Sequence, residues 1–381
     1  MNNQPEFQEK LYAASEKLLL SMKDMLDYFE TRGRMRVSDL HLKVGCPPTY
    51  RIDGRLDRMK GAPLDEATME KLARTVLSEQ NLQTLAAEGS VDSSCANGNL
   101  LFRLNCFHDR EGLAIAVRAL ERDIPGVEEI GFPNEAWRDI VGRQHGLILV
   151  TGITGAGKST TIASFIDRIL ATRPCRIITM EDPIEYRLTS QKGLVSQREV
   201  GRDLPSYERG LRDCLREDPD VIFVGEMRDM ESAAWTLTAA ETGHLVFSTL
   251  HTRDARGTIT RLIDMFPANR QDEVASQLSL GLRYVICQKL LPKADGSGRV
   301  VAMEILNNNY AIANLIRLRK IEQIYSHLQS RTKDIPEERM TTMEKHLAQL
   351  VVSGVVEAGE AQRWANDLNT FFDEMKHAGG Q

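Results

Sequence analysis

The sequence has little cysteine, no long apolar run and no excess of positive charge, and each absence excludes a class of protein. Its six cysteines form no C-x-x-C pair, so we expect neither a zinc ribbon nor a disulfide framework. No apolar run reaches the roughly 18 residues that a membrane-spanning helix needs. Residues 1–8 are polar and acidic, so we expect no signal peptide. A cytoplasmic protein with reduced thiols fits all three observations.

The charge balance argues against a general nucleic-acid binder. The net charge is −6 and the isoelectric point is about 5.9, whereas broad nucleic-acid binding usually requires a basic face. Hydrophobic residues make up 42% of the chain and charged residues 27%, which is ordinary for a globular protein. A length of 381 residues predicts two or three domains.

The hydrophobic pattern divides the chain into five segments. We predict an N-terminal extension at 1–21, a small α+β domain at 22–121 and a linker at 122–133. An α/β domain follows at 134–308, and a helical C-terminal region at 309–381. A helical period over about 6–30 suggests that the extension begins the first helix of its own domain, with a partner-binding helix as the alternative.

The two larger domains differ in their pattern of predicted strands and helices. In the first, strand-like pieces at 40–44, 50–52, 100–107 and 113–119 accompany one helical stretch at 64–87. In the second, short apolar strands at 147–150, 177–180, 221–224 and 245–248 alternate with helical stretches. Continuous apolar runs of this length are typical of parallel strands buried on both faces, so we expect a parallel sheet flanked by helices.

The segment from Gly152 to Ser159 fits the complete P-loop pattern, with a strand before it and a helical run after it. Glycines let the backbone amides wrap around phosphate, and the helix N-terminus adds partial positive charge. Lys158 is expected to reach the terminal phosphates and Ser159 to bind Mg²⁺. The residues predicted to bind ATP are Gly152, Thr154, Gly155, Gly157, Lys158, Ser159 and Thr160.

Acidic residues follow the next two strands. Glu181 and Glu185 lie at the end of the second strand, where ligands of parallel sheets bind, so either could polarise the attacking water. A solvated strand end is an equal alternative. After the third strand, Gly225 stands where the usual aspartate would be, which leaves Glu226 as the acid near Mg²⁺, acting through water. Asp220, at the other end of that strand, is less well placed.

The fourth strand leads into Thr249 and His251, with His244 just before it. A polar Thr-x-His at the end of such a strand suits a sensor of the γ-phosphate. For each histidine taken alone, a hydrogen-bonded structural role is the competing interpretation.

Four long motifs in the same order give the chain a resemblance to the PilT family of secretion-type ATPases. They read GITGAGKSTT (152–161), ITMEDPIEY (178–186), REDPDVIFVGEMRD (216–229) and TAAETGHLVFSTLHT (238–252). Shorter echoes are SDLHL (38–42), FRLNCF (102–107) and QREVGRD (197–203). The resemblance covers about residues 22–330.

The resemblance assigns roles residue by residue. It implies that Glu185 activates water, that Glu226 is the Walker B glutamate after the family's glycine, and that His244 and His251 are the two box histidines. Arg103 and Arg118 match arginines that reach ATP in the family, some of them across subunits. Further candidates are Arg198, Arg202, Arg212 and Arg216.

The family also implies an architecture and a task. It predicts a PAS-like N-terminal domain, a RecA-like P-loop domain and a homo-hexameric ring that hydrolyses ATP with Mg²⁺. The ring would act at the cytoplasmic side of the inner membrane on a pilus platform protein and drive type IV pilus retraction and twitching motility, with a second retraction ATPase as a further partner. The related extension and type II secretion ATPases are longer and carry a four-cysteine zinc insert that this chain lacks.

Other functions remain open at this point. The family's AIRNLIR segment appears here as AIANLIR, with Ala313 in place of arginine, so an accessory retraction ATPase of the PilU type is the nearest alternative. A regulatory subunit that binds ATP with little turnover is a second, and a nucleic-acid motor is a third. ATP turnover and its response to DNA would distinguish them.

Overall fold

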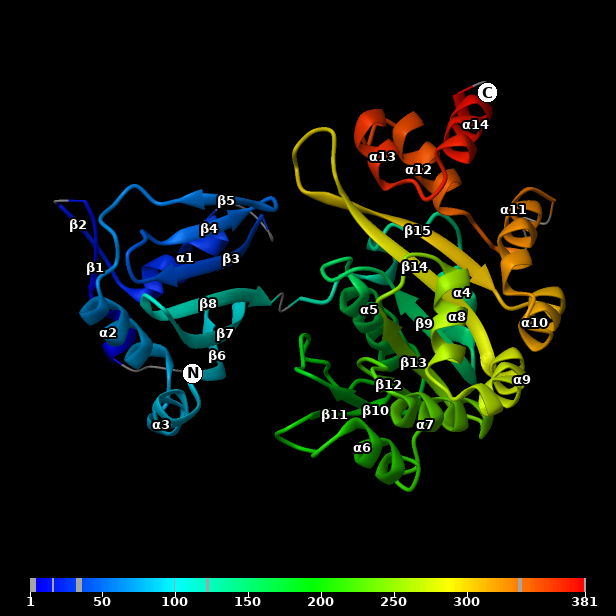
Figure 1. Cartoon of the computed structure of the whole chain (residues 1–381), viewed down its shortest axis with the longest axis horizontal. Helices are drawn as coiled ribbons and strands as arrows, with labels where there is room; N and C mark the ends of the chain where they lie inside the picture. The colour runs from blue at the N-terminus through cyan, green and yellow to red at the C-terminus, as the bar shows by residue number, and fades with distance from the viewer. Residues whose placement is uncertain are drawn as a thin grey trace. The chain divides into compact units, whose positions relative to one another are not determined.

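The computed structural model describes residues 5–15, 17–31, 36–98, 100–120, 123–334 and 338–379. The chain divides into two compact units, Met1–Asp123 and Ile124–Gln381, each with its own hydrophobic core (Figure 1). Residue 122, where the predicted linker begins, lies outside the described residues. Residues 124–133 belong to the second unit, and Val127 is buried in its core. In the described part of the chain, no helix has the length and hydrophobicity needed to cross a membrane.

The first unit is built on an antiparallel sheet of six strands in the order β5-β4-β3-β8-β7-β6. The strands are β3 (Val37–Lys43), β4 (Thr49–Ile52), β5 (Arg55–Arg58), β6 (Ser90–Asn97), β7 (Leu100–Asp109) and β8 (Gly112–Leu120), and the helices are α1 (Met22–Thr31), α2 (Glu66–Val76) and α3 (Glu79–Glu88). Alternate residues such as Leu40 and Leu42 point into one core with Met25 and Leu72 from the helices. The predicted α+β character is confirmed.

Two details of the first unit differ from the sequence prediction. Residues 12–15 and 18–20 are not helical: β1 (Tyr12–Ser15) and β2 (Leu18–Leu20) form an antiparallel pair after a short 3₁₀ helix, η1 (Pro5–Gln8). Helix α1 begins only at Met22, because Ser21 and Asp24 form a capping box: the Asp24 amide donates to the Ser21 hydroxyl at 3.1 Å, and the Ser21 amide to the Asp24 carboxylate at 2.6 Å.

The helix expected over 64–87 is two helices. Asp65 caps the first, accepting from the Thr68 amide at 2.7 Å, and Ser78 caps the second, accepting from the Asn81 amide at 3.2 Å. A second N-terminal cap inside an apparently continuous helical pattern starts a new helix in a new direction.

The second unit contains a sheet of seven strands in the order β11-β10-β12-β13-β9-β14-β15. Its strands are β9 (Gly146–Thr151), β10 (Arg176–Glu181), β11 (Leu194–Glu199), β12 (Val221–Val224), β13 (Leu245–Leu250), β14 (Leu282–Pro292) and β15 (Arg299–Asn307). All neighbours pair in parallel except β14 and β15. The four predicted strands and their parallel arrangement are confirmed, as expected for a RecA-like domain.

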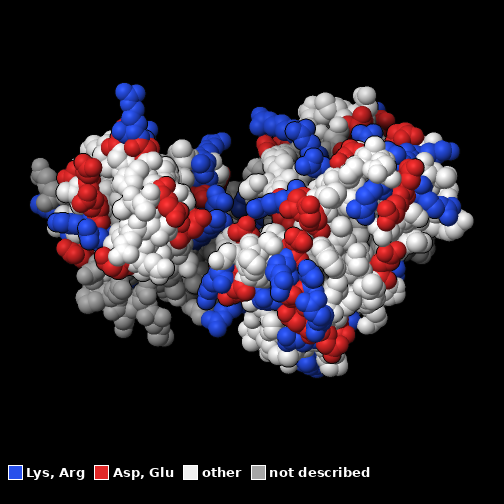
Figure 2. All heavy atoms as spheres, turned by 60° about the horizontal axis from the view of Figure 1, so that its bottom comes forward, with Lys and Arg blue, Asp and Glu red and all other residues white. Residues whose placement is uncertain are grey.

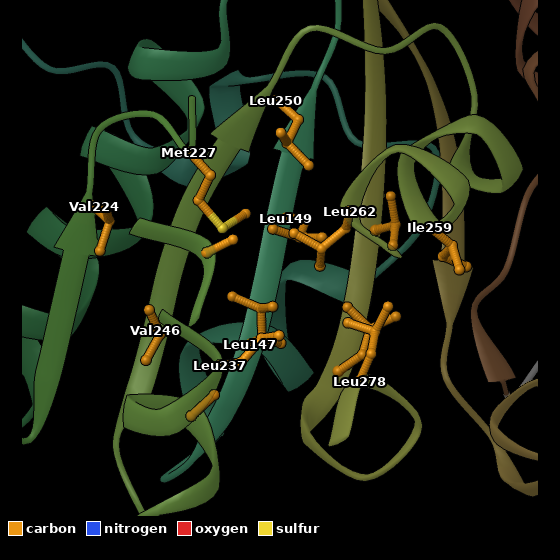
Figure 3. Close-up of a cluster of buried hydrophobic side chains, with 14 of the residues drawn as sticks. Leu147, Leu149, Val224, Met227, Leu237, Val246, Leu250, Ile259, Leu262 and Leu278 are labelled. Atoms are coloured by element: carbon orange, nitrogen blue, oxygen red, sulfur yellow. The ribbon is translucent and has the colours of Figure 1, made fainter. Parts of the chain in front are cut away.

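Helices cover both faces of this sheet because its strands are apolar on both sides. Leu147 and Leu149 of β9 face the layer of α6 (Tyr207–Cys214), α7 (Met230–Glu241), α8 (Ala255–Asp264) and α9 (Gln271–Gly281), which Figure 3 shows in part. Ile148 and Val150 face the opposite layer, formed by α4 (Ala136–Gly142) and α5 (Lys158–Thr172), with the 3₁₀ turn η2 (Val127–Glu129). The phosphate-binding end of β9 therefore stands on a rigid, fully buried strand.

The C-terminal region is helical, as predicted. It comprises α10 (Tyr310–Arg317), the 3₁₀ turn η4 (Ile321–Gln323), α11 (Ile324–Asp334), α12 (Met343–Val352), α13 (Ala358–Trp364) and α14 (Leu368–Gly379). A further 3₁₀ turn, η3 (Ala268–Arg270), lies earlier in the unit, between α8 and α9. Helices α12–α14 pack on the long β14–β15 hairpin around Leu291, Leu347 and Phe371 (Figure 1). The Lys289 ammonium of β14 donates to the Trp364 carbonyl and to Asn366, both at 2.6 Å.

Charges of both signs are mixed on the surface of the second unit. On the face shown in Figure 2, lysines and arginines lie among aspartates and glutamates. Exposed side chains of this unit form short-range pairs, such as Arg209 with Asp213 at 2.8 Å and Arg216 with Asp213 at 2.6 Å. Such exposed pairs contribute little to stability.

Candidate nucleotide-binding and catalytic site

The P-loop connects β9 to α5 at the carboxyl end of the sheet. Gly157, directly before the helix, has φ +86°, a left-handed conformation that favours glycine. A Cβ on Gly152 would lie 2.5 Å from the Gln288 carbonyl oxygen of β14, so this position also requires glycine. The Gln288 side chain donates to Thr161 of α5 at 2.8 Å, which fixes the start of the helix against the same strand.

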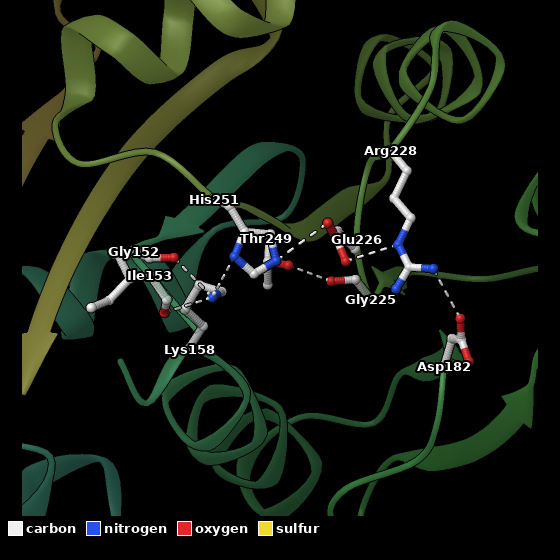
Figure 4. Close-up of polar contacts among 9 residues, drawn as sticks. All are labelled: Gly152, Ile153, Lys158, Asp182, Gly225, Glu226, Arg228, Thr249 and His251. Atoms are coloured by element: carbon white, nitrogen blue, oxygen red, sulfur yellow. Dashed lines mark hydrogen bonds and ion pairs between the residues drawn. The ribbon is translucent and has the colours of Figure 1, made fainter. Parts of the chain in front are cut away.

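Lys158 is a buried cation that lacks a carboxylate partner. Its side chain is 8% exposed, and its Nζ donates to the carbonyls of Gly152 at 2.9 Å and Ile153 at 3.1 Å (Figure 4). Among the described residues it forms no ion pair. Burial lowers the pKa of Lys158, and nearby Glu226 and Glu185 act in the opposite direction. A cation held only by neutral groups in a glycine-rich loop is suited to an anionic ligand.

A chain of polar contacts runs from Lys158 across the ends of three strands (Figure 4). His251 Nδ1 lies 3.5 Å from Lys158 Nζ, and its Nε2 lies 3.3 Å from Glu226 Oε1. Arg228 then bridges Glu226, at 3.0 Å, and Asp182, at 3.2 Å. His251 therefore stands between Lys158 and Glu226, the residues that the sequence predicts to contact the phosphates and the metal ion.

The two glutamates after β10 occupy different environments. Glu181 is 7% exposed, and burial raises its pKa to about 7 although Thr179, Gln197 and the Glu185 backbone donate hydrogen bonds to it. Glu185 is exposed, and in the described part of the chain no hydrogen bond or ion pair holds its side chain. Its charge nevertheless acts on Lys158. A carboxylate without a hydrogen-bond partner suits a water-activating base better than one already committed to three donors.

The structure does not bring His244 to this group. His244 immediately precedes β13, at the end of the sheet opposite the P-loop, and Leu245 pairs with Gly146 at the start of β9. Its Nδ1 lies 3.0 Å from the Ala239 carbonyl and 3.2 Å from the Thr242 hydroxyl, so within this chain it joins α7 to β13. Asp220 lies at that same end, where its carboxylate accepts from the Arg176 amide at 2.7 Å.

The remaining predicted phosphate-binding residues lie along the loop and the first turn of α5. Thr154 and Gly155 are exposed, Ser159 is half-buried, and Thr160 forms a 2.8 Å hydrogen bond with the hydroxyl of Tyr186. This contact links α5 to the segment that carries Glu185. Across the loop from them, the Thr249 hydroxyl donates to the Gly225 carbonyl at 2.6 Å and holds the ends of β12 and β13 together.

The predicted trans-acting arginines lie in the first unit. Arg103 of β7 and Arg118 of β8 are paired directly opposite each other on these two neighbouring antiparallel strands. Arg118 pairs with the buried Asp39 at 2.8 Å while its own side chain stays 61% exposed, and Arg103 lies 3.7 Å from Asp92. Both are therefore anchored at the surface of the unit. The further candidate Arg198 instead pairs with Glu217 at 3.0 Å.

The donor set fits a nucleotide that brings its own metal ion. In the part of the chain that the structure describes, no group of three or more histidine, cysteine, aspartate or glutamate side chains could hold a metal ion. The P-loop offers Ser159 and the end of β12 offers Glu226, which is too few ligands for a site made by protein alone. Mg²⁺ commonly binds through one or two protein ligands and substrate phosphates, so this arrangement is compatible with ATP–Mg²⁺.

Sequence reasoning missed three residues that shape the site. Arg228, Tyr186 and Gln197 all stand inside or beside the long motifs, yet none was assigned a role. An arginine two positions beyond Glu226 was a usable signal for Arg228. For Tyr186 and Gln197 the sequence gives no such signal, because their partners come from other segments.

Comparison with known proteins finds similarity to secretion and pilus ATPases over most of the chain. A family model described as "Type II/IV secretion system protein" matches residues 34–378. The type IV pilus retraction ATPase PilT of Pseudomonas aeruginosa is 40% identical over 349 residues, covering 91% of this chain and 100% of the relative. The type IV pilus ATPase PilU of the same organism is 34% identical over 333 residues, covering 87% and 86%. A crystal structure of the pilus retraction motor PilT with bound ADP superimposes with a TM-score of 0.80 at 45% identity, covering 92% and 98%.

Proposed function

The chain belongs to the type II/IV secretion system protein family, and from this membership we propose that it is the ATPase motor of type IV pilus retraction. The observation that carries the proposal is the chain of contacts from Lys158 through His251 to Glu226. The charge of Glu185 also acts on the same lysine and raises its pKa against the effect of burial. The likeness to a retraction motor with bound ADP supports ATP as the substrate.

Each site residue has a role in this proposal. The P-loop amides and Lys158 bind the phosphates, while Ser159 and Glu226 hold Mg²⁺, the latter through water; the metal supplies charge neutralisation. Glu185 accepts a proton from the attacking water, and His251 reports the terminal phosphate to Glu226. His244 joins α7 to β13 and so supports the strand that ends at His251.

Beyond one chain, we propose a homo-hexamer at the cytoplasmic face of the inner membrane. Arg103 and Arg118 would reach the nucleotide of a neighbouring subunit, since arginines supplied in trans accelerate phosphoryl transfer by about 10³–10⁵. The ring would turn a membrane platform protein, and a second retraction ATPase could share the load. Ala313, half-buried in α10, marks the departure that keeps an accessory role as the second candidate.

Steady-state ATP hydrolysis by the purified protein with Mg²⁺ tests the enzymatic part. We expect Lys158→Ala to lose nucleotide binding and Glu185→Gln to lose about 10²–10⁴ in turnover while still binding a fluorescent ATP analogue. Glu208→Gln, an exposed carboxylate on α6, is the matched control. Wild-type turnover in the Glu185→Gln variant would contradict the role of Glu185, and binding without turnover in the wild type would favour a regulatory subunit.

Complementation tests the cellular part. Expression in a Pseudomonas aeruginosa strain that lacks PilT should restore twitching if the chain is a principal retraction motor. Restoration only in a strain that lacks PilU and retains PilT would support the accessory role. No restoration in either strain, with ATP turnover intact, would contradict both.

A further inference from the structure

The segment between β10 and β11 that carries Glu185, residues 182–188, is held by side chains instead of by a backbone ladder. The Ile184 amide donates to Glu199 Oε2 at 3.1 Å, and the Leu188 amide donates to Gln197 Oε1 at 2.7 Å. Between them, the Glu185 backbone donates to the Glu181 carboxylate. Three side chains, two of them from β11, therefore hold the backbone of the segment, while the side chains of Asp182 and Tyr186 contact Arg228 and Thr160.

Gln197 makes the largest contribution to this support. Besides accepting from Leu188, its Nε2 donates to the Tyr186 carbonyl at 2.8 Å and to Glu181 Oε1 at 3.1 Å. One amide thus holds the backbone directly after Glu185, at Tyr186 and Leu188, and also holds the carboxylate that accepts from the Glu185 backbone. An alanine or an apolar side chain could replace none of these three bonds.

The register of the sheet explains why β11 can do this. Thr179 pairs with Gln197 and Glu181 with Glu199, so these β11 residues stand beside the last residues of β10, where the segment begins. Gln197 and Glu199 are two apart and point to the same face of the sheet, whereas Arg198 between them pairs with Glu217. In the QREVGRD motif, candidate roles were assigned from the sequence only to Arg198 and Arg202, whereas Gln197 and Glu199, the first and third residues, are the ones that bond to the segment.

Glu185 itself is exposed, and in the described part of the chain its side chain has no hydrogen-bond partner. The position of the Glu185 carboxylate is therefore constrained by the backbone of the segment and not by contacts of the side chain. Tyr186 adds a second tether to the P-loop helix through its 2.8 Å bond to Thr160. A base displaced by about 1 Å from its productive position can lose about 10² in rate.

We propose that Gln197 and Glu199 of β11 are positioning residues that hold the segment 182–188, and with it the Glu185 carboxylate, against the P-loop. The catalytic part of this inference rests on the proposed ATPase function. The physical part, namely that these two side chains order the segment, stands on the contacts alone. Two separate measurements can therefore test the two parts.

Gln197→Met, which keeps the length of the side chain and removes all three hydrogen bonds, tests the catalytic part. We expect kcat for ATP hydrolysis to fall by about 10- to 100-fold with KM nearly unchanged, because the phosphate cradle is intact. Gln191→Met is the matched control, since the Gln191 amide bonds to the half-buried Asp167 of α5 at 3.0 Å and not to the segment. An unchanged kcat would overturn the proposal.

A double-mutant cycle shows whether the effect passes through Glu185. In a Glu185→Gln background, Gln197→Met should cost almost nothing further, because there is no base left to misplace. The same additional loss in both backgrounds would overturn the positioning role. Gln197→Glu is a second variant, which places a carboxylate beside that of Glu181. Its turnover should be low near pH 8, where the two carboxylates repel each other, and should recover towards pH 6, where they can share a proton.

Amide hydrogen exchange tests the physical part without catalysis. Peptides covering 182–188 should exchange faster in Gln197→Met than in the wild type, while peptides of the P-loop strand β9 should not change. Fast exchange together with a wild type that does not hydrolyse ATP would retain the structural part and reject only the proposed function. Equal exchange in both proteins would overturn the inference even if the enzyme is active.

Discussion

Replacement of Glu304 by glutamine should remove a large pH dependence from the stability of the second unit. Glu304 lies on β15, opposite Cys287, and is 1% exposed. Its Oε1 accepts from the Ala255 amide at 2.7 Å, and its Oε2 has no partner among the described residues. Burial raises its pKa from the ordinary 4.5 to about 8, against the opposing charge of Lys289, so at neutral pH the folded protein holds a neutral carboxyl group here.

The sign and size of this pH dependence of the free energy of unfolding follow from proton linkage. Between pH 4.5 and 8 the folded state keeps a proton on Glu304 that the unfolded state has lost, so the free energy of unfolding falls as the pH rises through this window. The slope is about 1.4 kcal/mol per pH unit in the middle of the window, which amounts to about 3.5 kcal/mol between pH 5 and pH 8. Glutamine has the shape of the neutral acid and does not titrate.

Urea unfolding followed by tryptophan fluorescence measures this. Trp137, Trp235 and Trp364 are the only tryptophans, and all belong to the second unit, so the signal reports the unit that contains Glu304. We expect the amount by which Glu304→Gln exceeds the wild type in free energy of unfolding to be about 3.5 kcal/mol larger at pH 8 than at pH 5.

Other titrating groups do not confuse the comparison. Glu181 and His346 have shifted pKa values but occur in both proteins, so their contributions cancel in the difference. Glu231→Gln, an exposed residue in the first turn of α7, should follow the wild type at every pH. A difference between Glu304→Gln and the wild type that stays constant from pH 5 to pH 8 would refute the reasoning.

Three further predictions concern the phosphate loop, the metal site and the N-terminal hairpin. Gly152→Ala should abolish ATP-analogue binding measured by fluorescence, because its Cβ would lie 2.5 Å from the Gln288 carbonyl; retained affinity would contradict this. Arg228→Met should lower the Mg²⁺ concentration for half-maximal turnover, since Glu226 loses a positive neighbour; an unchanged Mg²⁺ titration would show that the pair is inert. Tyr12→Ala should destabilise the first unit by about 3–5 kcal/mol in thermal unfolding followed by circular dichroism, because this side chain is 2% exposed; a loss below about 1 kcal/mol would show that the hairpin is dispensable.

The features that the sequence predicted are those encoded by neighbouring residues. The P-loop with its flanking strand and helix, the four buried strands and their parallel order all follow from local patterns, and the structure agrees with them. The acidic residues after β10 and β12 were also placed at the same edge, because parallel strands bring their carboxyl ends together.

The features that the sequence did not predict depend on contacts between distant segments. β11 reads LVSQRE, with a polar half that suggests a loop, and it becomes a strand because Gln197 and its neighbours pair with β10. The hairpin at 12–20 has helix-compatible spacing, but Tyr12 is buried and its hydroxyl bonds to the Ala62 carbonyl at 3.0 Å. The resemblance paired His244 with His251 as the two box histidines, but β13 (Leu245–Leu250) lies between them and places them at opposite ends of the sheet.

The long strand β14 connects the P-loop helix α5 to the C-terminal helices. Gln288 holds the helix that follows the phosphate loop, and the next residue, Lys289, holds the chain between α13 and α14. Adjacent residues of a strand point to opposite faces and lie only about 3.3 Å apart along it. A displacement of α13 and α14 would therefore be transmitted to the P-loop helix α5 through two adjacent residues of β14, with no loop between them.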